Sequence, residues 1–255
     1  MSSTPQSASE VTASIRHRLV LAVDNLKMQD RAIILKALTF IEGHYDKYRR
    51  KTKTFPDRGI HLIAHPMRVA LILINEIEIK DTGAISAALL HELVEWKRDK
   101  VSIADIERLF GRPIAMLVSI LTKPPVEKDA TGEERVQRLN TYYRRIEQAS
   151  VVSKLVKLCD RLDSVREAPD WIDSEKQRQY LEETKGIYLP IAEASDSYLH
   201  EELLTAVEAL EQSLNKGAKS TTDTPEIVEV GCEIADDGFK RSDEEYAARK
   251  KSDSI

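Results

Sequence analysis

Apolar residues recur three and four positions apart along most of the first 215 residues. This spacing places them on one face of a helix and is typical of helices that cover a common core. The sequence is therefore expected to fold as an all-α, single-domain helical bundle. The pattern predicts helices at residues 11–26, 30–48, 67–77, 83–96, 103–110, 113–121, 132–149, 151–162, 177–196 and 201–214.

Turn and capping residues separate these segments. The stretch 55–59, Phe-Pro-Asp-Arg-Gly, has turn chemistry, and Ser102 with Asp105 three residues later predicts a helix start at 103. Pro66 suits the first turn of a helix, where its missing N–H costs nothing, so His65 is expected at a helix start.

The two ends of the chain lack the helical pattern. Residues 1–9 are rich in Ser and Thr, and residues 216–255 mix charged and hydroxyl side chains with few apolar ones. We expect both ends to be disordered and residues 10–215 to form the folded domain. An alternative for the tail is a short docking motif at 227–234.

Composition narrows the possible functions. The 255 residues are 42% hydrophobic and 32% charged, enough for one large core, and the net charge of −5 argues against nucleic-acid binding as the main task. Cys159 and Cys232 have no disulfide or zinc spacing, which suits a reducing cytoplasm. We see no signal peptide and no apolar run of transmembrane length, so a soluble, cytoplasmic protein without membrane partners is expected.

Four residues form a candidate metal site: His65, His91, Glu92 and Asp160. Two imidazoles and two carboxylates suit a divalent ion such as Mn²⁺ or Fe²⁺. Asp160 lies inside an apolar helix, where an unpaired carboxylate is costly and a metal removes that cost. The alternative is structural: Asp160 pairs with an arginine and His91 is a satisfied core histidine.

Other charged residues extend this candidate site. Glu95 follows His91 by one helical turn, so it could meet a metal-bound water or the imidazole. Ahead of His65 lies a basic loop whose Lys47, Arg49 and Arg50 suit a substrate with several phosphates. A solvated charged turn is the other interpretation of this loop.

Several blocks in order resemble the hydrolase domain of the RelA/SpoT family, from His44 to Glu193. They are IAHPMRVALIL, AALLHELVEW, IERLFGRPIAMLVSILTK, KLVKLCDRLDSVRE and YLEETKGIYLPIAE. The resemblance implies a stand-alone HD-type, Mn²⁺-dependent enzyme that removes pyrophosphate from the 3′ position of (p)ppGpp. It also implies that His65, His91, Glu92 and Asp160 hold the ion, that Glu95 orients or deprotonates the attacking water, and that Arg49 binds substrate.

The chain departs from the family pattern at several positions. Glu92 replaces the Asp of the HD dipeptide, Trp96 replaces a second acid, and Ser164 replaces a nucleotide-binding Asn, for which it offers a shorter hydrogen-bonding side chain. Leu62 stands where the family has Tyr. Two other hypotheses therefore stay open: a degenerate HD module that binds a nucleotide or a protein without turnover, and a hydrolase of another nucleotide. The apolar stripe at 201–214 leaves a homodimer possible.

Overall fold

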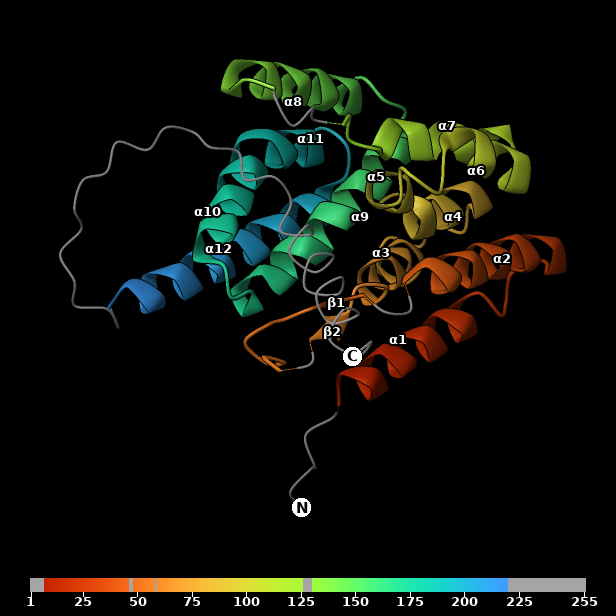
Figure 1. Ribbon diagram of the computed structural model, residues 1–255, viewed down its shortest axis with the longest axis horizontal. Helices are drawn as coiled ribbons and strands as arrows, with labels where there is room; N and C mark the ends of the chain where they lie inside the picture. Colours follow the sequence, from red (N-terminus) through yellow and green to blue (C-terminus); the bar gives the residue numbers. More distant parts are fainter. Residues whose placement is uncertain (1–6, 46–47, 58, 126–129, 220–255) are drawn as a thin grey trace, which may run out of the picture.

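The computed structural model describes residues 7–45, 48–57, 59–125 and 130–219, and the predicted all-α class is confirmed (Figure 1). In this part of the chain no helix combines the length and apolar character needed to cross a membrane. The helices and the two short strands are α1 (Ala8–Ala22), α2 (Met28–Tyr45), β1 (Arg49–Arg50), β2 (Ile60–His61), α3 (Ala64–Asn75), α4 (Thr82–Leu90), α5 (Leu93–Trp96), α6 (Ile103–Phe110), α7 (Arg112–Leu121), α8 (Gly132–Glu147), α9 (Val151–Glu167), η1 (Ala168–Asp170), α10 (Ser174–Glu183), η2 (Thr184–Tyr188), α11 (Leu189–Glu193) and α12 (Ser197–Lys219).

Helices α3, α4 and α9 pack against one another and form the centre of the molecule. Helix α1 covers α3, α2 and α7 cover α4, and α12 covers α9 (Figure 1). Between Ala64 and Ile74, every residue of α3 except Arg68 is buried. These three helices therefore place their side chains in the core, away from water.

Helix α9 carries charged residues into this core. Lys157, Asp160, Arg161 and Asp163 are all buried, among apolar neighbours such as Leu158. A buried charge without a partner is strongly destabilising, because its lost hydration is not replaced. The groups that pair with these charged side chains therefore indicate which ligand this part of α9 can bind.

The observed helix ends differ slightly from the predicted domain limits. Helix α1 begins at Ala8, because Ser7 and Glu10 form a reciprocal capping box, and α12 extends to Lys219. The apolar stripe of α12, which suggested a homodimer, includes Leu203 and Leu210 and is buried in the core. The homodimer stays a prediction. The remaining tail segments, 1–6 and 220–255 with Cys232, lie outside the described residues.

Two segments predicted as continuous helices are interrupted. Residues 83–96 form α4 and α5, separated at His91 and Glu92, where the His91 ring nitrogen Nδ1 bonds the carbonyl oxygen of Ala88 at 2.8 Å. Residues 177–196 form α10, a π-helical turn and α11. Pro190 explains this second change, since it lacks an N–H and its ring crowds the carbonyl four residues earlier.

The basic loop forms a small antiparallel ribbon beside the start of α3. Strand β1 pairs with β2 so that Arg49 lies opposite His61 and Arg50 opposite Ile60. Because neighbouring residues of a strand point to opposite faces, Arg49 and Arg50 are directed to different sides of the ribbon.

Candidate metal centre and its pocket

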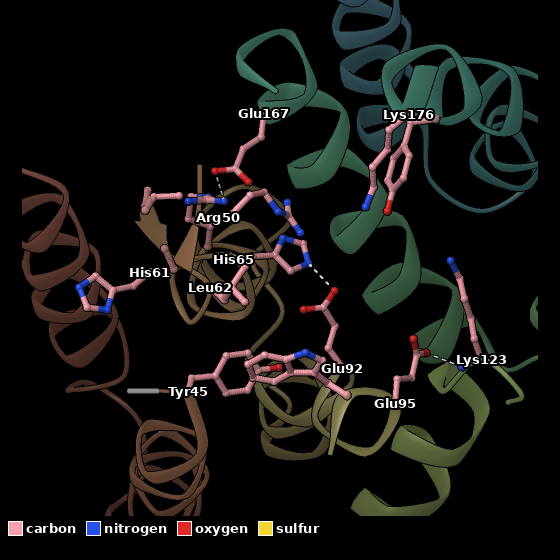
Figure 2. Close-up of a pocket in the computed structure, with 15 residues that line it drawn as sticks. Tyr45, Arg50, His61, Leu62, His65, Glu92, Glu95, Lys123, Glu167 and Lys176 are labelled. Atoms are coloured by element: carbon pink, nitrogen blue, oxygen red, sulfur yellow. Dashed lines mark hydrogen bonds and ion pairs between the residues drawn. The ribbon is translucent and has the colours of Figure 1, made fainter. Parts of the chain in front are cut away.

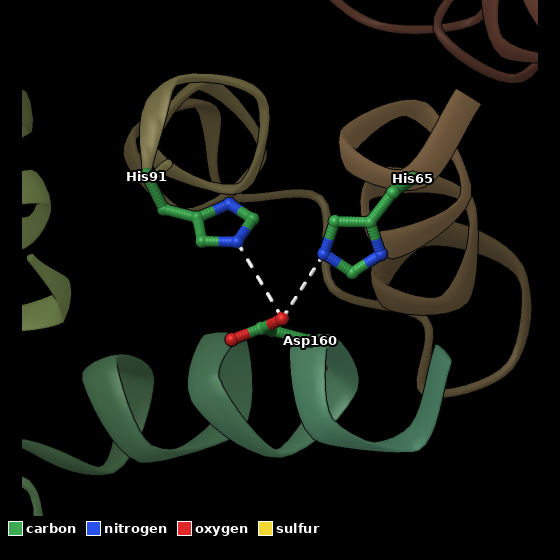
Figure 3. A group of neighbouring side chains, drawn as sticks. All are labelled: His65, His91 and Asp160. Carbon is green, nitrogen blue, oxygen red and sulfur yellow. Dashed lines mark hydrogen bonds and ion pairs between the residues drawn. The ribbon is translucent and has the colours of Figure 1, made fainter. Parts of the chain in front are cut away.

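Three central helices each bring one side chain to a common point. His65 comes from the first turn of α3, His91 from the end of α4 and Asp160 from the middle of α9 (Figure 3). The Nε2 atoms of His65 and His91 lie 3.1 and 3.5 Å from Oδ1 of Asp160. All three residues are buried, and their ligand atoms lie within 4.8 Å of one another.

The hydrogen bonds of His91 favour a metal ion at this point. Its Nδ1 atom faces the carbonyl of Ala88, which only accepts, so the proton is on Nδ1 and the lone pair is on Nε2. Nε2 is buried and has no hydrogen-bond partner among the described residues. A lone pair that faces the Asp160 carboxylate needs a cation or a proton between them, and a divalent ion meets that need.

His65 is held by a carboxylate on its other side. Its Nδ1 atom donates to Asp163 at 2.7 Å, and Arg68 donates to both oxygens of Asp163 at 2.7 and 2.9 Å. This chain of bonds fixes the ring and leaves the Nε2 lone pair directed at Asp160. Carboxylates that bond the outer nitrogen of a histidine are the usual support of a metal ligand.

The electrostatic balance of the cluster also suits a cation. Burial alone would raise the pKa of Asp160, but Lys157 and His91 hold it well below its usual range. Lys157 donates to Oδ2 at 2.6 Å, so Oδ1 is the oxygen turned to the two imidazoles. Burial likewise would lower the pKa of His65, and its acidic neighbours Glu92, Asp160 and Asp163 raise it instead. A positive charge is therefore stabilised between these side chains.

Glu92, the fourth predicted ligand, lies at the edge of this group. Its Oε1 atom is 3.8 Å from Nε2 of His65, and its side chain is 38% exposed. Burial alone would raise the pKa of Glu92, but the positive charges of His65, His91 and, more weakly, Arg50 lower it. The structure thus brings three predicted ligands together and places the fourth beside one of them.

His65 and Glu92 open onto a pocket of about 840 Å³, counting the part that is open to solvent (Figure 2). The walls come from the end of α2, the two strands, the start of α3, α5, the segment that follows α7, the end of α9 and α10. Charged side chains of both signs line it, including Arg50, Glu95, Lys123, Glu167 and Lys176.

Glu95 and Trp96 occupy the pocket wall formed by α5. Oε1 of Glu95 accepts a hydrogen bond from the backbone N–H of Lys123. Burial raises the pKa of Glu95, against the opposing effect of Lys123 and Lys157. The Trp96 ring packs on Tyr45 and Tyr48, with ring centroids 4.6 and 4.3 Å apart. An aromatic wall therefore stands where the related family has its second acid.

The predicted substrate residues have different positions. Arg50 lines the pocket, whereas Arg49 is exposed, does not line the pocket, and contacts the lining residue His61. Ser164 is half-buried and is not part of the pocket wall. Lys47 lies outside the described residues.

Asp163, Arg68 and Lys157 were not predicted as part of the site, although a signal was present. Asp163 and Lys157 stand three residues on either side of Asp160, and Arg68 stands three residues after His65. Residues three apart share a helix face, so each of these charges accompanies a ligand into the core.

Comparison with known proteins identifies the family of this chain. A family model of the HD domain matches residues 37–197. The chain belongs to the HD domain family. The all-helical bundle is thus that of an HD domain, and the resemblance to the RelA/SpoT hydrolases is confirmed by relatives in sequence and structure.

The HD domain has relatives among enzymes of guanosine polyphosphates. This chain is 33% identical over 165 residues to a probable guanosine-3′,5′-bis(diphosphate) 3′-pyrophosphohydrolase of Synechocystis. The alignment covers 63% of this chain and 20% of that protein. It is 30% identical over 157 residues to the enzyme of that name from Xenopus tropicalis, which covers 60% of this chain and 81% of the relative. A solved structure, described as a metazoan ortholog of SpoT that hydrolyzes ppGpp, aligns with a TM-score of 0.59 and 26% identity over 70% of this chain and 95% of its own.

Proposed function

We propose that this HD domain removes pyrophosphate from the 3′ position of guanosine 3′,5′-bis(diphosphate), leaving GDP. The observation that carries the proposal is the buried His65–His91–Asp160 cluster. Through His65 it opens onto a pocket whose lining includes the cations Arg50, Lys123 and Lys176 beside several carboxylates. The relatives named above support the choice of substrate.

The cofactor in this proposal is a divalent metal, and we infer Mn²⁺ from the mixture of imidazole and carboxylate ligands. His65, His91 and Asp160 would hold it, with Glu92 as a fourth ligand on the pocket side. When bound, such an ion lowers the pKa of water and neutralises charge on a phosphate.

The side chains around the ion have distinct tasks. Glu95 orients and deprotonates the attacking water, and its raised pKa brings it closer to the range of an effective base. Lys123 N–H engages Oε1, so the proton passes to Oε2 of Glu95. Arg50 neutralises phosphate charge from the pocket wall, in a position that Arg49 does not reach.

The test measures release of pyrophosphate from ppGpp by the purified full chain with Mn²⁺ and again after chelation. We expect release that depends on the metal and is abolished in His91→Ala. His17→Ala, an exposed histidine of α1, is the matched control and should behave as the native chain does. Hydrolysis that persists in folded His91→Ala would exclude the proposed site.

A second function is favoured by one observation. Trp96 and its partner Tyr45 occupy the wall where the related family has an acid, and the Glu95 carboxylate is already engaged by Lys123. These features suit a module that binds a nucleotide without cleaving it. Tight binding of ppGpp by the metal-loaded protein with no release of pyrophosphate would favour this function.

A further inference from the structure

Lys157 is a buried cation that the proposed function leaves without a task. It stands one helical turn before Asp160 on α9, and it is 6% exposed. It is not among the described residues that line the pocket, so it does not reach a substrate there. Its Nζ atom donates to Oδ2 of Asp160 at 2.6 Å. Any effect of Lys157 on the metal centre is therefore exerted through Asp160.

The two oxygens of Asp160 have different neighbours. Oδ1 lies 3.1 Å from Nε2 of His65 and 3.5 Å from Nε2 of His91, whereas Oδ2 accepts from Lys157. Figure 3 shows one carboxylate oxygen facing both imidazoles and the other apart from them. A carboxylate can bind a metal ion through one oxygen or through both. Here Oδ1 is the oxygen that is left for the ion.

Two tyrosines keep the Lys157 ammonium group at Oδ2. Nζ lies 5.6 Å from the ring centroid of Tyr142 on α8 and 5.7 Å from that of Tyr188 in η2. Both rings are at most 1% exposed, and the Tyr142 hydroxyl donates to the carbonyl oxygen of Leu121 at 2.9 Å. Aromatic faces attract a cation at this range. Packing from two further elements thus restrains the lysine.

Stability alone does not account for a lysine at this position. Removing an ammonium group from water is costly, and a buried ion pair often stabilises a protein no more than a hydrophobic pair of the same size. A divalent ion at the His65–His91–Asp160 cluster would itself neutralise the carboxylate. Lys157 places a second positive charge beside it, which opposes metal binding by repulsion. A role that requires both cations is control of how Asp160 binds the ion.

We propose that Lys157 is a positioning residue that restricts Asp160 to metal binding through Oδ1 alone and thereby discriminates against Ca²⁺. Ca²⁺ takes about 6–8 oxygen ligands and commonly uses both oxygens of a carboxylate. An ion such as Mn²⁺ has about six positions and is satisfied by fewer carboxylate oxygens. The inference rests on the proposed function, because it assigns the ion to the same cluster.

Two substitutions separate the hydrogen bond of Lys157 from its charge. Lys157→Met removes both at nearly constant volume, whereas Lys157→Gln keeps an N–H donor for Oδ2 without the charge. Lys154→Met, at a half-buried lysine of the same helix, is the matched control. Mn²⁺ binding to the chelated full chain is measured by electron paramagnetic resonance, and Ca²⁺ binding by competition with Mn²⁺.

The expected result is a change in selectivity and not only in affinity. Lys157→Met should bind both ions more tightly because the repulsion is lost, and the gain should be about tenfold larger for Ca²⁺, since Oδ2 becomes available. Lys157→Gln should bind both ions more tightly by the same factor, which keeps the native ratio of affinities. Lys154→Met should leave both affinities unchanged.

A merely structural lysine gives a different pattern. Equal gains for Mn²⁺ and Ca²⁺ in Lys157→Met, or weaker binding of Mn²⁺, would overturn the proposal. Circular dichroism of the metal-free variants establishes that they are folded. If Lys157→Met does not fold, Lys157→Gln decides alone, and a ratio of affinities that departs from the native one counts against the restraint.

Release of pyrophosphate from ppGpp separates this inference from the proposed function. If Lys157 controls the ratio of Ca²⁺ to Mn²⁺ affinity but no protein releases pyrophosphate, the positioning role stands and the proposed hydrolysis fails. If the native chain releases pyrophosphate with Mn²⁺ and Lys157→Met shows the native selectivity, the hydrolysis stands and the positioning role fails. A native chain that binds no Mn²⁺ would overturn both.

Discussion

His65 is held between two carboxylates, one at each ring nitrogen. Asp163 bonds Nδ1 at 2.7 Å, and Asp160 lies 3.1 Å from Nε2. A neutral imidazole donates at one nitrogen only, so the Asp163 bond determines which nitrogen is left to bind a metal. Arg68 in turn prevents Asp163 from rotating away. Asp163 is thus a positioning residue for the proposed centre.

We predict that Asp163→Asn weakens Mn²⁺ binding by about tenfold or more, because the amide is a poorer acceptor and loses its bond to the Arg68 charge. Isothermal titration with Mn²⁺ measures this change. Asp24→Asn, at an exposed ion pair with Arg31, is the control. Equal Mn²⁺ affinity of Asp163→Asn and the native chain would contradict the positioning role.

At the residue scale, the sequence identifies the candidate metal ligands better than the residues that position them. His65, His91 and Asp160 could be predicted because their residue types suit a metal and two of them interrupt apolar runs. Asp163 and Arg68 lie 95 residues apart, and no local pattern shows that they meet. Arg50 and Arg49 are similarly indistinguishable by residue type, and only the strand pairing decides which one enters the pocket.

At the scale of elements, short helices depend on their caps. Helix α6 begins with a reciprocal box in which Ser102 caps Asp105 N–H and Asp105 accepts from Ser102. The Ser102 hydroxyl, Arg108 and the Ser102 backbone N–H lower the pKa of Asp105 from 3.8 to about 2. A carboxyl group whose pKa is lower in the folded state stabilises the protein when the pH is above its unfolded-state pKa. That stabilisation is lost as the pH falls through the folded-state pKa.

Asp105→Asn should therefore lower the melting temperature at neutral pH, and the difference from the native chain should shrink as pH falls from about 4 toward about 2. Thermal unfolding followed by circular dichroism over a pH series measures it. Glu175→Gln, which removes the charge of an exposed ion pair with Arg178, serves as the comparison. A difference that stays constant below pH 4 would show that the Asp105 charge has no such role.

Helix α3 contributes stability in a different way, through complete burial. Leu73 is fully buried where α3 meets its neighbours, so Leu73→Ala should lower the free energy of unfolding by about 2–5 kcal/mol. Urea denaturation gives the value. Leu204→Ala, on α12 and 39% exposed, should change it by less than about 0.5 kcal/mol. Similar losses in both variants would argue against a rigid core at α3.

The positions of most helices could be predicted because their apolar periodicity reflects packing on a shared core. The two places where a predicted helix is interrupted could not be predicted. The helix break at His91 coincides with a side-chain bond to Ala88, and the π-helical turn lies directly before Pro190, where the backbone accommodates a missing N–H. Apolar periodicity continues through both places and conceals them. The two short strands are likewise too brief to leave a pattern.

At the scale of the whole molecule, the proposed metal joins the three helices of the core. An ion that binds only the folded protein stabilises it, by about 2.7 kcal/mol when its concentration is 100 times its dissociation constant. Mn²⁺ should accordingly raise the melting temperature of the native chain and of His17→Ala, but not of His91→Ala. Calorimetric scans with and without chelator measure the shift. An equal shift in His91→Ala would mean that the ion binds elsewhere.

The ligands and the pocket walls belong to different parts of the architecture. His65, His91 and Asp160 are fixed in densely packed helices, whereas Arg50, Trp96 and Lys176 project from a ribbon, a four-residue helix and the edge of α10. Substitutions in the walls can therefore accumulate over evolution at little cost to folding, while those in the packed helices are removed by selection. A lineage with this arrangement can acquire new nucleotide preferences and still inherit an intact reactive centre.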